Sequence, residues 1–266
     1  MKVLIVGYGN MGKTYANSFI SSRFIKSEDI FVLVRNENFS TPESSIPKTN
    51  FSHIPTDKIS DFDIVIFAVK PQDFSVLAQS IKPFLKDNQI IFSVMAGITI
   101  AKLEAELSCS KIVRSMPNIP TQIGMGMTVF TASANVDRKE LFIIQNLINT
   151  TGKSVYVENE KLIDAATAIS GSGPAYVFYF MQSMIKAAVD LGFNESEAEL
   201  LVNQTFMGSV AIQNSYSLSN EEWIAKVASK GGTTESALRV FEKEMLEKTI
   251  VEAVKAANDR ALELGS

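Results

Sequence analysis

The sequence predicts an α/β protein in which a parallel sheet, with helices on both faces, is followed by an all-α domain. Two observations predict this class. In the first half of the chain, short apolar runs alternate with segments that carry apolar residues at helical spacing, as in repeated βα units. After residue 157 the strand-like runs stop, and long helical patterns replace them. We therefore expect two domains, residues 1–158 and 159–266.

The predicted strands of the first domain are mostly apolar throughout, which is typical of strands that are buried on both faces. They comprise residues 3–6, 30–34, 64–69, 89–94, 111–114, 127–130 and 154–157. The predicted helices between them have apolar residues three and four positions apart, and they comprise residues 10–22, 72–85, 100–107 and 138–149. Residues 35–58 are polar without a clear period, and they indicate a weak strand or a long surface connection.

Helical patterns in the second domain cover residues 162–169, 175–191, 196–216, 221–228, 235–245 and 247–262. The first half of the segment 175–191 is apolar around most of its circumference, which is more than a small domain covers on its own. We interpret this segment as a buried helix that forms a dimer. The alternative is a central core helix of a monomer.

Composition and charge exclude several classes of protein. With 46% hydrophobic and 20% charged residues, the chain is too apolar for disorder and too mixed for a fibre. The net charge of −4 provides no basic field, so we expect no nucleic-acid partner. The apolar run that ends at Gly7 is too short for a signal peptide, and no run is long enough for a membrane span, so we expect no membrane partner.

The chain has a single cysteine, Cys109, and a single histidine, His53. They allow neither an intramolecular disulfide nor a histidine cluster for zinc. We therefore expect no bound metal, and we expect the protein in the reducing cytoplasm.

A glycine pattern after the first predicted strand carries a functional signal. Gly7, Gly9 and Gly12 satisfy GxGxxG directly after a strand and directly before a helix. In the Rossmann-type fold, the first glycine permits a tight turn and the second lets the backbone approach a pyrophosphate. The third lets the helix pack close to the strand. We therefore expect a Rossmann-type sheet that binds a dinucleotide.

The end of the second predicted strand indicates which dinucleotide binds. An NAD-specific domain has Asp or Glu there to bind the ribose hydroxyls, but this chain has Arg35 and then Asn36. Because the planar guanidinium suits a 2′-phosphate, we expect NADPH as the cofactor, with NADH as the alternative. In the other interpretation, Arg35 is a solvated surface residue and Glu37 supplies the acid.

Further turns follow predicted strands at the carboxyl edge, where ligands bind in open α/β sheets. Lys70 and Pro71 follow one strand, although Pro71 also suits the first turn of any helix. Residues 95–97 are small enough at a second strand end for a flat ring to approach, or they form only a tight turn. Residues 114–120 place two prolines and an amide side chain at the end of a third strand.

Two segments of the helical domain are more specialised than connections need to be. Residues 170–175 separate two predicted helices with two glycines, two hydroxyls and a proline. Residues 229–234, SKGGTT, run straight into a helix, so a glycine turn meets unpaired helix amides. We assign this anion site to a substrate carboxylate. The alternative is that Thr233 or Thr234 only caps the helix.

Taken together, these segments resemble the pyrroline-5-carboxylate reductase family. The landmarks GYGNMG, AVKPQ, SVMAGIT, VRSMPNIP, DAATAISGSGPAYVF and SKGGTTESAL occur in the family's order, from residue 3 to about residue 245. The resemblance implies NAD(P)H-dependent reduction of the cyclic imine 1-pyrroline-5-carboxylate to L-proline, the last step of proline biosynthesis. It also implies a Rossmann domain followed by a helical domain that interlocks in a homodimer, with dimers assembling further.

The resemblance also assigns roles to individual residues. The residues that it assigns to the cofactor are Gly7, Gly9, Asn10, Met11 and Gly12 at the pyrophosphate, Ala68, Val69, Lys70 and Pro71 at the ribose, and Met95, Ala96, Gly97, Pro117 and Asn118 at the nicotinamide. We add Arg35 and Asn36 to this cofactor set because of their position after the second strand, not because of the resemblance. The substrate set is Ser229, Gly231, Gly232, Thr233 and Thr234. The chain departs from the family pattern at Lys230, Ile119 and Gly12, where proline, threonine and alanine are usual.

The expected reaction needs little from protein acids. A protonated imine is already electrophilic, so the protein must mainly hold the reacting carbons close together, exclude water and fix the carboxylate. Thr234 is the candidate catalytic residue, as a hydroxyl bonded to the imine or amine nitrogen, and a water is the alternative donor. Two other functions stay open: a catalytically silent NADPH-binding regulatory paralogue, and a β-hydroxyacid dehydrogenase with Lys161 or Lys186 as its acid.

Overall fold

The computed structural model describes residues 1–36 and 44–265. The chain forms two compact units, Met1–Ser172 with Ala257–Ser266, and Gly173–Ala256. The first unit contains a sheet and its covering helices, and the second consists of helices. The predicted fold class is confirmed, whereas the domain boundary predicted at residue 158 stays a prediction.

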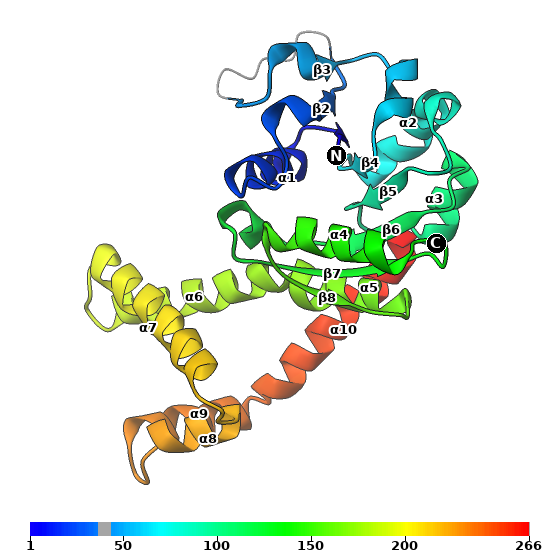
Figure 1. Ribbon diagram of the computed structural model, residues 1–266. Coiled ribbons are helices and arrows are strands. Elements are labelled where there is room, and N and C mark those ends of the chain that lie inside the picture. Colours follow the sequence, from blue (N-terminus) through cyan, green and yellow to red (C-terminus); the bar gives the residue numbers. More distant parts are fainter. Residues whose placement is uncertain (37–43, 266) are drawn as a thin grey trace. The chain divides into compact units, whose positions relative to one another are not determined.

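Within the described residues, the sheet has eight strands in the order β3-β2-β1-β4-β5-β6-β7-β8 (Figure 1). The chain enters at β1 and builds outward in both directions, so the order reverses between β1 and β4. Ligands of open α/β sheets bind at such a switch point, outside the carboxyl ends of the strands. The strands are β1 (Val3–Val6), β2 (Ile30–Leu33), β3 (Phe51–Ser52), β4 (Ile64–Phe67), β5 (Ile90–Ser93), β6 (Ile112–Met116), β7 (Gly126–Ala132) and β8 (Gly152–Tyr156).

One pair of strands departs from the predicted parallel sheet. Neighbouring strands run parallel except β6 and β7, which are antiparallel, with Arg114 opposite Thr131. The connection between these two strands contains only a 3₁₀ helix, η6 (Ile119–Ile123). A parallel crossover needs a dozen or more residues, usually with an α-helix, so the short connection requires the chain to turn back.

The described part of the polar segment 35–58 contains β3 and the 3₁₀ helix η2 (Lys48–Asn50), and a second 3₁₀ helix, η3 (Asp57–Asp61), begins at its end. The Asn50 side chain donates hydrogen bonds of 3.0 Å to the carbonyls of Glu28 and Ile30, which fixes the approach to β3. Of the two predicted alternatives, the weak strand is therefore correct at the end of this segment. Residues 37–43, which include Glu37 and Pro42, lie outside the described residues.

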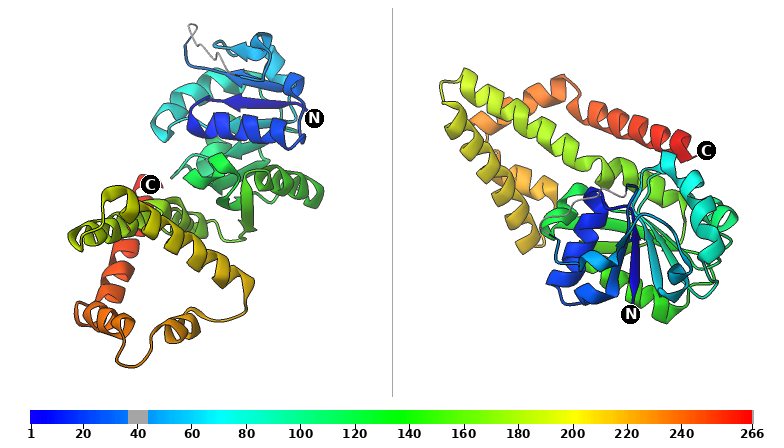
Figure 2. Two further views of the ribbon diagram at one scale, coloured as in Figure 1. Left: turned by 90° about the vertical axis from the view of Figure 1, so that its left-hand side faces the viewer. Right: turned by 90° about the horizontal axis from the view of Figure 1, so that it is seen from above.

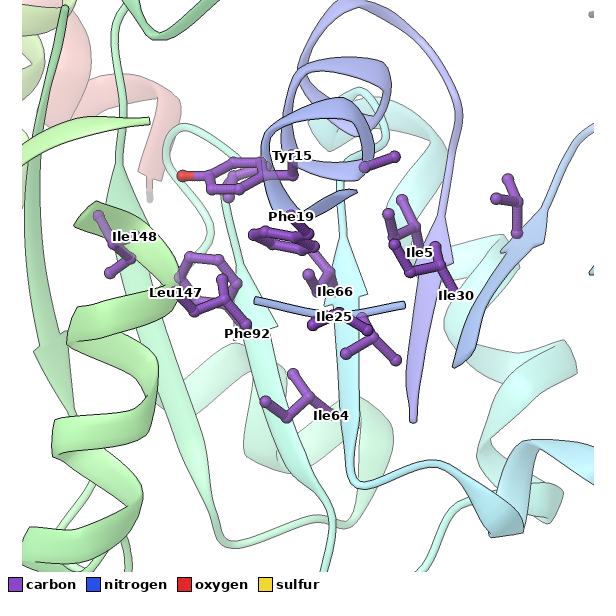
Figure 3. Packing of buried hydrophobic residues seen from close by; sticks show 14 of the residues in the cluster. Ile5, Tyr15, Phe19, Ile25, Ile30, Ile64, Ile66, Phe92, Leu147 and Ile148 are labelled. Atoms are coloured by element: carbon purple, nitrogen blue, oxygen red, sulfur yellow. The ribbon is translucent and has the colours of Figure 1, made fainter. Parts of the chain in front are cut away.

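Helices cover both faces of the sheet, and each face has its own hydrophobic cluster (Figure 2). Tyr15, Phe19 and Leu147 pack against one face, from α1 and α4 (Figure 3). Phe74 and Leu103 pack against the other, from α2 and α3. These helices are α1 (Asn10–Ser21), α2 (Phe74–Ile81), α3 (Ile100–Leu107) and α4 (Arg138–Asn149), with the 3₁₀ helices η1 (Ser27–Asp29), η4 (Pro71–Asp73) and η5 (Lys82–Phe84).

The first unit ends in a change of helix type. The α-helix α5 (Lys161–Ala166) continues into a π-helix, η7 (Thr167–Gly171), in which the Ser172 amide donates to the Thr167 carbonyl at 2.8 Å. The sequence predicts that residues 170–175 separate two helices, whereas the backbone stays helical almost without a break. The departure from α-helical geometry, rather than a loop, is what these residues provide.

The second unit exposes most of its apolar side chains. None of the residues of α6 is buried, and Phe178 and Tyr179 are 61% and 71% exposed. The buried hydrophobic residues of residues 173–256 are Ala198 and Val202, both on α7. The interpretation of this helix as the core of a monomer is therefore wrong. The helices are α6 (Gly173–Asp190), α7 (Glu195–Ser215), α8 (Asn220–Val227), α9 (Thr233–Lys243) and α10 (Leu246–Gly265).

Among the residues that the structure describes, every helix falls short of the length and hydropathy that a membrane crossing requires.

Candidate active site

A cleft of about 620 Å³ opens at the switch point, where β1, β2 and β4 end. It brings together many of the predicted cofactor residues, namely Gly7, Gly9, Arg35, Asn36, Ala68, Val69 and Lys70. The predicted residues Met11, Gly12, Pro71, Met95, Ala96, Gly97, Pro117 and Asn118 do not line this cleft. Asn10 lines a second cavity of about 570 Å³, between α1 and η6.

The glycine loop has the geometry that its sequence pattern predicts. Gly7 has a φ of +94°, and a Cβ there would lie 2.8 Å from the carbonyl oxygen of Ala68. A Cβ on Gly12 would clash with the carbonyl oxygen of Gly7, so α1 approaches the loop too closely for the alanine that is usual at this position. A Cβ on Gly9 would meet no atom within 4 Å, which leaves open space beside the backbone.

The amino end of α1 faces this open space. The N-cap residue is Gly9, which has no side chain to accept a hydrogen bond from the helix amides. The first-turn amides of α1 therefore have no cap acceptor, and helix amides at this position have no intrahelical partner. Such an end binds phosphate, so the loop fits the pyrophosphate of a dinucleotide.

Charged side chains stand at the far end of the same cleft. Arg35 lies two residues after the end of β2, and its side chain is 82% exposed. Its Nη1 lies 3.5 Å from Oδ2 of Asp73, and Lys70 lines the cleft beside them. The arginine predicted to bind a 2′-phosphate is thus placed where a ligand can reach it, but it already has a carboxylate partner.

Two of the residues predicted at the nicotinamide, Met95 and Asn118, have side chains that contact other parts of the protein. Met95 is 2% exposed and packs in the cluster under α2 and α3. The Asn118 side chain accepts from the Met127 amide at 2.9 Å and donates to the Ser170 carbonyl at 3.0 Å. It therefore fastens the end of β6 to both β7 and the π-helix. A contact between these residues and a cofactor stays a prediction.

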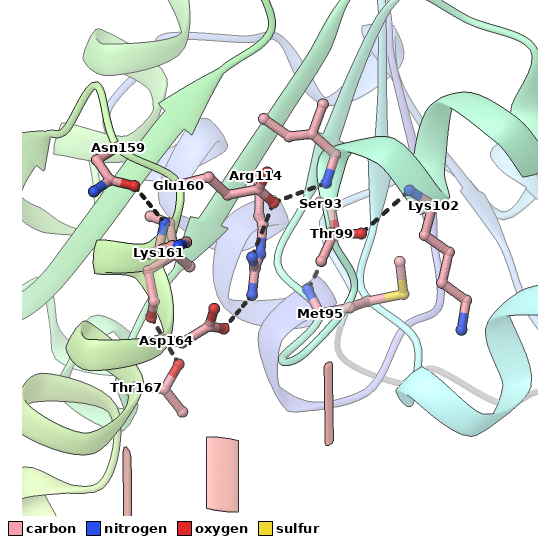
Figure 4. A network of polar contacts seen from close by, with 12 residues as sticks. Ser93, Met95, Thr99, Lys102, Arg114, Asn159, Glu160, Lys161, Asp164 and Thr167 are labelled. Carbon is pink, nitrogen blue, oxygen red and sulfur yellow. Dashed lines mark hydrogen bonds and ion pairs between the residues drawn. The ribbon is translucent and has the colours of Figure 1, made fainter. Parts of the chain in front are cut away.

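A buried ionic network supports the same region (Figure 4). Arg114 on β6 is 1% exposed, and its guanidinium donates to Glu160 at 2.9 Å and to Asp164 at 2.5 Å. Glu160 also accepts from the Ile100 amide at 2.8 Å, which ties the network to the start of α3. The three charged side chains thus connect β6, α5 and the start of α3, which follows the loop that contains residues 95–97. Sequence reasoning missed this network, although Arg114 lies in one of the segments that it singled out.

The predicted substrate loop belongs to the second unit. Gly231 has a φ of +74°, and its amide donates to Oε2 of Glu235 at 2.6 Å. The positive φ therefore favours glycine at position 231, whereas a Cβ on Gly232 would meet the hydroxyl of Ser229 at 2.6 Å, a side-chain atom that can move. Glu235 was not among the predicted site residues, but its position three residues after the cap is the one from which a glutamate turns back to a preceding amide.

The structure of this loop also tests the alternative prediction that Thr233 or Thr234 only caps the helix. The N-cap residue of α9 is Gly232, and no side chain makes a cap hydrogen bond there. Thr233 and Thr234 are the first two residues of the helix, where the amides have no intrahelical partner. A capping role for either hydroxyl is therefore wrong in this structure. The loop instead presents amides, one of which already binds a carboxylate.

No metal-binding group of three or more His, Cys, Asp or Glu side chains occurs within residues 1–36 and 44–265. The two lysines considered for a dehydrogenase, Lys161 and Lys186, are exposed on α5 and α6.

Comparison with known proteins identifies both parts of the chain. Residues 2–97 match a family model described as NADP oxidoreductase coenzyme F420-dependent, and residues 160–264 match one described as pyrroline-5-carboxylate reductase dimerisation. The fold and the site thus define an NAD(P)-binding oxidoreductase with a helical dimerisation domain.

Individual relatives extend over the whole chain. Pyrroline-5-carboxylate reductase of Aquifex aeolicus is 34% identical over 99% of this chain and 97% of its own length. The crystal structure of Plasmodium falciparum pyrroline carboxylate reductase with NADP bound has a TM-score of 0.89 and 31% identity, covering 100% of this chain and 98% of that one. The Coxiella burnetii pyrroline-5-carboxylate reductase structure has a TM-score of 0.90 and 29% identity over the same shares. The chain belongs to the pyrroline-5-carboxylate reductase family.

Proposed function

We propose that this chain reduces L-1-pyrroline-5-carboxylate to L-proline with NADPH, in the last step of proline biosynthesis. The observation that carries the proposal is the match to the Aquifex aeolicus reductase over 99% of the chain, glycine loop and SKGGTT loop included. A silent NADPH-binding paralogue would need the glycine loop but not the SKGGTT loop. The relatives reported above are pyrroline-5-carboxylate reductases, which favours this reaction over that of a β-hydroxyacid dehydrogenase.

The cofactor residues fit NADPH. The close approach of Gly12 to Gly7, the open space at Gly9 and the uncapped start of α1 suit a pyrophosphate, and Arg35 suits a 2′-phosphate. We propose that the whole predicted set, from Gly7 to Asn118, contributes to this binding, and that residues 1–158 form the dinucleotide-binding domain. When bound, NADPH supplies the hydride.

The substrate loop holds the other reactant. In our proposal, the backbone amides that follow Gly231 and Gly232 bind the substrate carboxylate, and the dipole of α9 favours its negative charge. The carboxylate of Glu235 accepts from the Gly231 amide, which supports a carboxylate as the group that this turn binds. Thr234 places a hydroxyl next to these amides, where it donates to or accepts from the ring nitrogen.

The helical domain gives the assembly. Self-association follows from the dimerisation family and from the exposed apolar residues of α6. We propose that the chain is a homodimer, that dimers assemble further, and that the protein works in the cytoplasm, where its one cysteine, Cys109, stays reduced.

One assay tests the function. The purified protein should oxidise NADPH in the presence of pyrroline-5-carboxylate, which is followed by the loss of nicotinamide absorbance and by the formation of proline. The reverse reaction, oxidation of proline or thioproline with NADP at high pH, distinguishes an enzyme from a silent binding protein. Tight binding of NADPH with no turnover in either direction would establish the regulatory paralogue instead.

A further inference from the structure

A carboxylate lies inside the cofactor cleft, opposite the arginine that suits a 2′-phosphate. Oδ2 of Asp73 is 3.5 Å from Nη1 of Arg35, and both residues line the cleft. Arg35 comes from the loop after β2 and Asp73 from η4, which follows β4, so the pair spans the cleft between its two walls. Both side chains are accessible, at 82% and 43% exposure, so an arriving anion meets the pair rather than a lone guanidinium.

Asp73 makes no capping hydrogen bond that would explain its position. It is the N-cap residue of α2, where an aspartate usually accepts a hydrogen bond from a backbone amide of the first turn. No such side-chain bond is present at this cap. The carboxylate is instead directed to Arg35, across the space that a ligand enters.

The charge balance of the cleft follows from three side chains. Among its described lining residues, Arg35 and Lys70 are positive and Asp73 is negative. A 2′-phosphate must compete with Asp73 for the donors of Arg35 and is repelled by the same carboxylate. A ribose with free hydroxyls carries no charge, so its binding depends much less on Asp73.

We propose that Asp73 is a specificity-determining residue of the cofactor cleft: its carboxylate weakens the binding of a 2′-phosphate and thereby brings NADPH and NADH closer together in affinity. The inference rests on the proposed function, because it takes this cleft as the place of the cofactor's adenosine end. The usual sequence fingerprint for the choice between NAD and NADP is the residue at the end of the second strand. Asp73, about 40 positions later, would affect the same choice.

Binding of two mononucleotides tests the inference without any turnover. The probe 2′,5′-ADP carries the 2′-phosphate, and 5′-AMP lacks it. In isothermal titration at low salt, Asp73→Asn should lower the Kd of 2′,5′-ADP by about three- to tenfold and change that of 5′-AMP by less than about twofold. High salt should shrink the difference, because screening weakens exposed charges. The ratio of kcat/KM for NADPH over NADH should rise by the same factor.

Two further variants make the test specific. Asp57→Asn removes the same charge from an exposed residue that does not line the cleft, and it should leave both Kd values unchanged. In an Arg35→Gln background, Asp73→Asn should lose most of its effect, because the two residues act on the phosphate together. A Kd of 2′,5′-ADP that stays constant in Asp73→Asn, or that changes equally with that of 5′-AMP, overturns the inference.

The test also separates the inference from the proposed function. If the selectivity shifts as expected while no pyrroline-5-carboxylate is reduced, the inference stands and the proposed function fails. If the reductase activity is present and the selectivity does not shift, the inference alone fails. If neither mononucleotide binds to the unaltered protein, both the cofactor cleft and the inference are wrong.

Discussion

Removing the cation of the buried network should destabilise the protein strongly. Arg114 is 1% exposed, and the side chains of its partners Asp164 and Glu160 are 12% and 32% exposed. The variant Arg114→Met keeps much of the side-chain volume but leaves two carboxylates near each other without their cation. Removing one partner of a buried ion pair costs about 3–5 kcal/mol, and Asp164 is enclosed enough for that range to apply.

The expected loss of unfolding free energy can be converted into a change of melting temperature. For a protein of this size, each kcal/mol shifts the midpoint by about 2–4 °C, so the variant should melt about 6–20 °C lower. The measurement is thermal or urea unfolding followed by circular dichroism. Because the chain self-associates, parent and variants must be compared at one protein concentration.

A surface pair gives the matched control. Arg260 donates to Glu263 at 2.7 Å, but their side chains are 66% and 64% exposed. Arg260→Met should therefore cost no more than about 1 kcal/mol. Replacing Arg114 and Asp164 together by apolar residues should recover part of the loss, since it removes the unpaired charge. If Arg114→Met lies within about 1 kcal/mol of the parent, the burial argument for this network is refuted.

Four other variants or treatments test the rest of the account. Thr234→Ala should lower kcat/KM about ten- to a thousandfold with unchanged NADPH affinity and melting temperature, if its hydroxyl contacts the reacting nitrogen; normal turnover would exclude that role. Arg35→Asp should erase or reverse a preference for NADPH, which is expected to be about tenfold or more in the unaltered enzyme; equal use of both cofactors by the parent would contradict the assignment. Phe178→Asp places a charge on the exposed apolar face of α6 and should abolish both assembly and activity, as seen by light scattering and the reductase assay; an active dimer would show that this face lies outside the interface. Burial raises the pKa of the Cys109 thiol from 9.0 to about 11, so at pH 9 the folded protein should react with iodoacetamide much more slowly than the unfolded chain. The unfolded thiol loses its proton first, so this group's contribution to stability is present below pH 9 and is lost as the pH rises towards 11, a slope that Cys109→Ala should remove.

Local chemistry made much of the fold predictable. The requirement for glycine at Gly12 comes from the Gly7 carbonyl within the same turn, and Gly7 has a positive φ of +94° that its sequence pattern predicts. The helices over residues 100–107 and 138–149 have the predicted bounds, because their apolar spacing and their caps at Thr99 and Asp137 lie in adjacent sequence. The predicted helix over residues 72–85 is divided, since Pro83 has no amide to donate and the last turn tightens to a 3₁₀ helix.

What the sequence did not predict depends on residues that are far apart in the chain. Arg114 pairs with Asp164 and Glu160, and Arg35 pairs with Asp73, without any local pattern that announces either pair. The antiparallel β7 follows from the length of one connection, a weaker signal than hydrophobic periodicity. In the site, the threonine caps were a reasonable local alternative, but the turn uses Gly232 as its cap.

The last part of α10 has a consequence for how the protein is made. Residues 257–265 belong to the same compact unit as residues 1–172, and Ala261 within them is buried. During synthesis the ribosome releases residues 1–172 first, and the helical unit must follow before the end of α10 emerges. A nascent chain that stops before residue 257 therefore has an incomplete sheet domain. The surface that the end of α10 covers in the folded unit is then accessible to chaperones and proteases. The unit that begins the chain is completed only after the other has been translated.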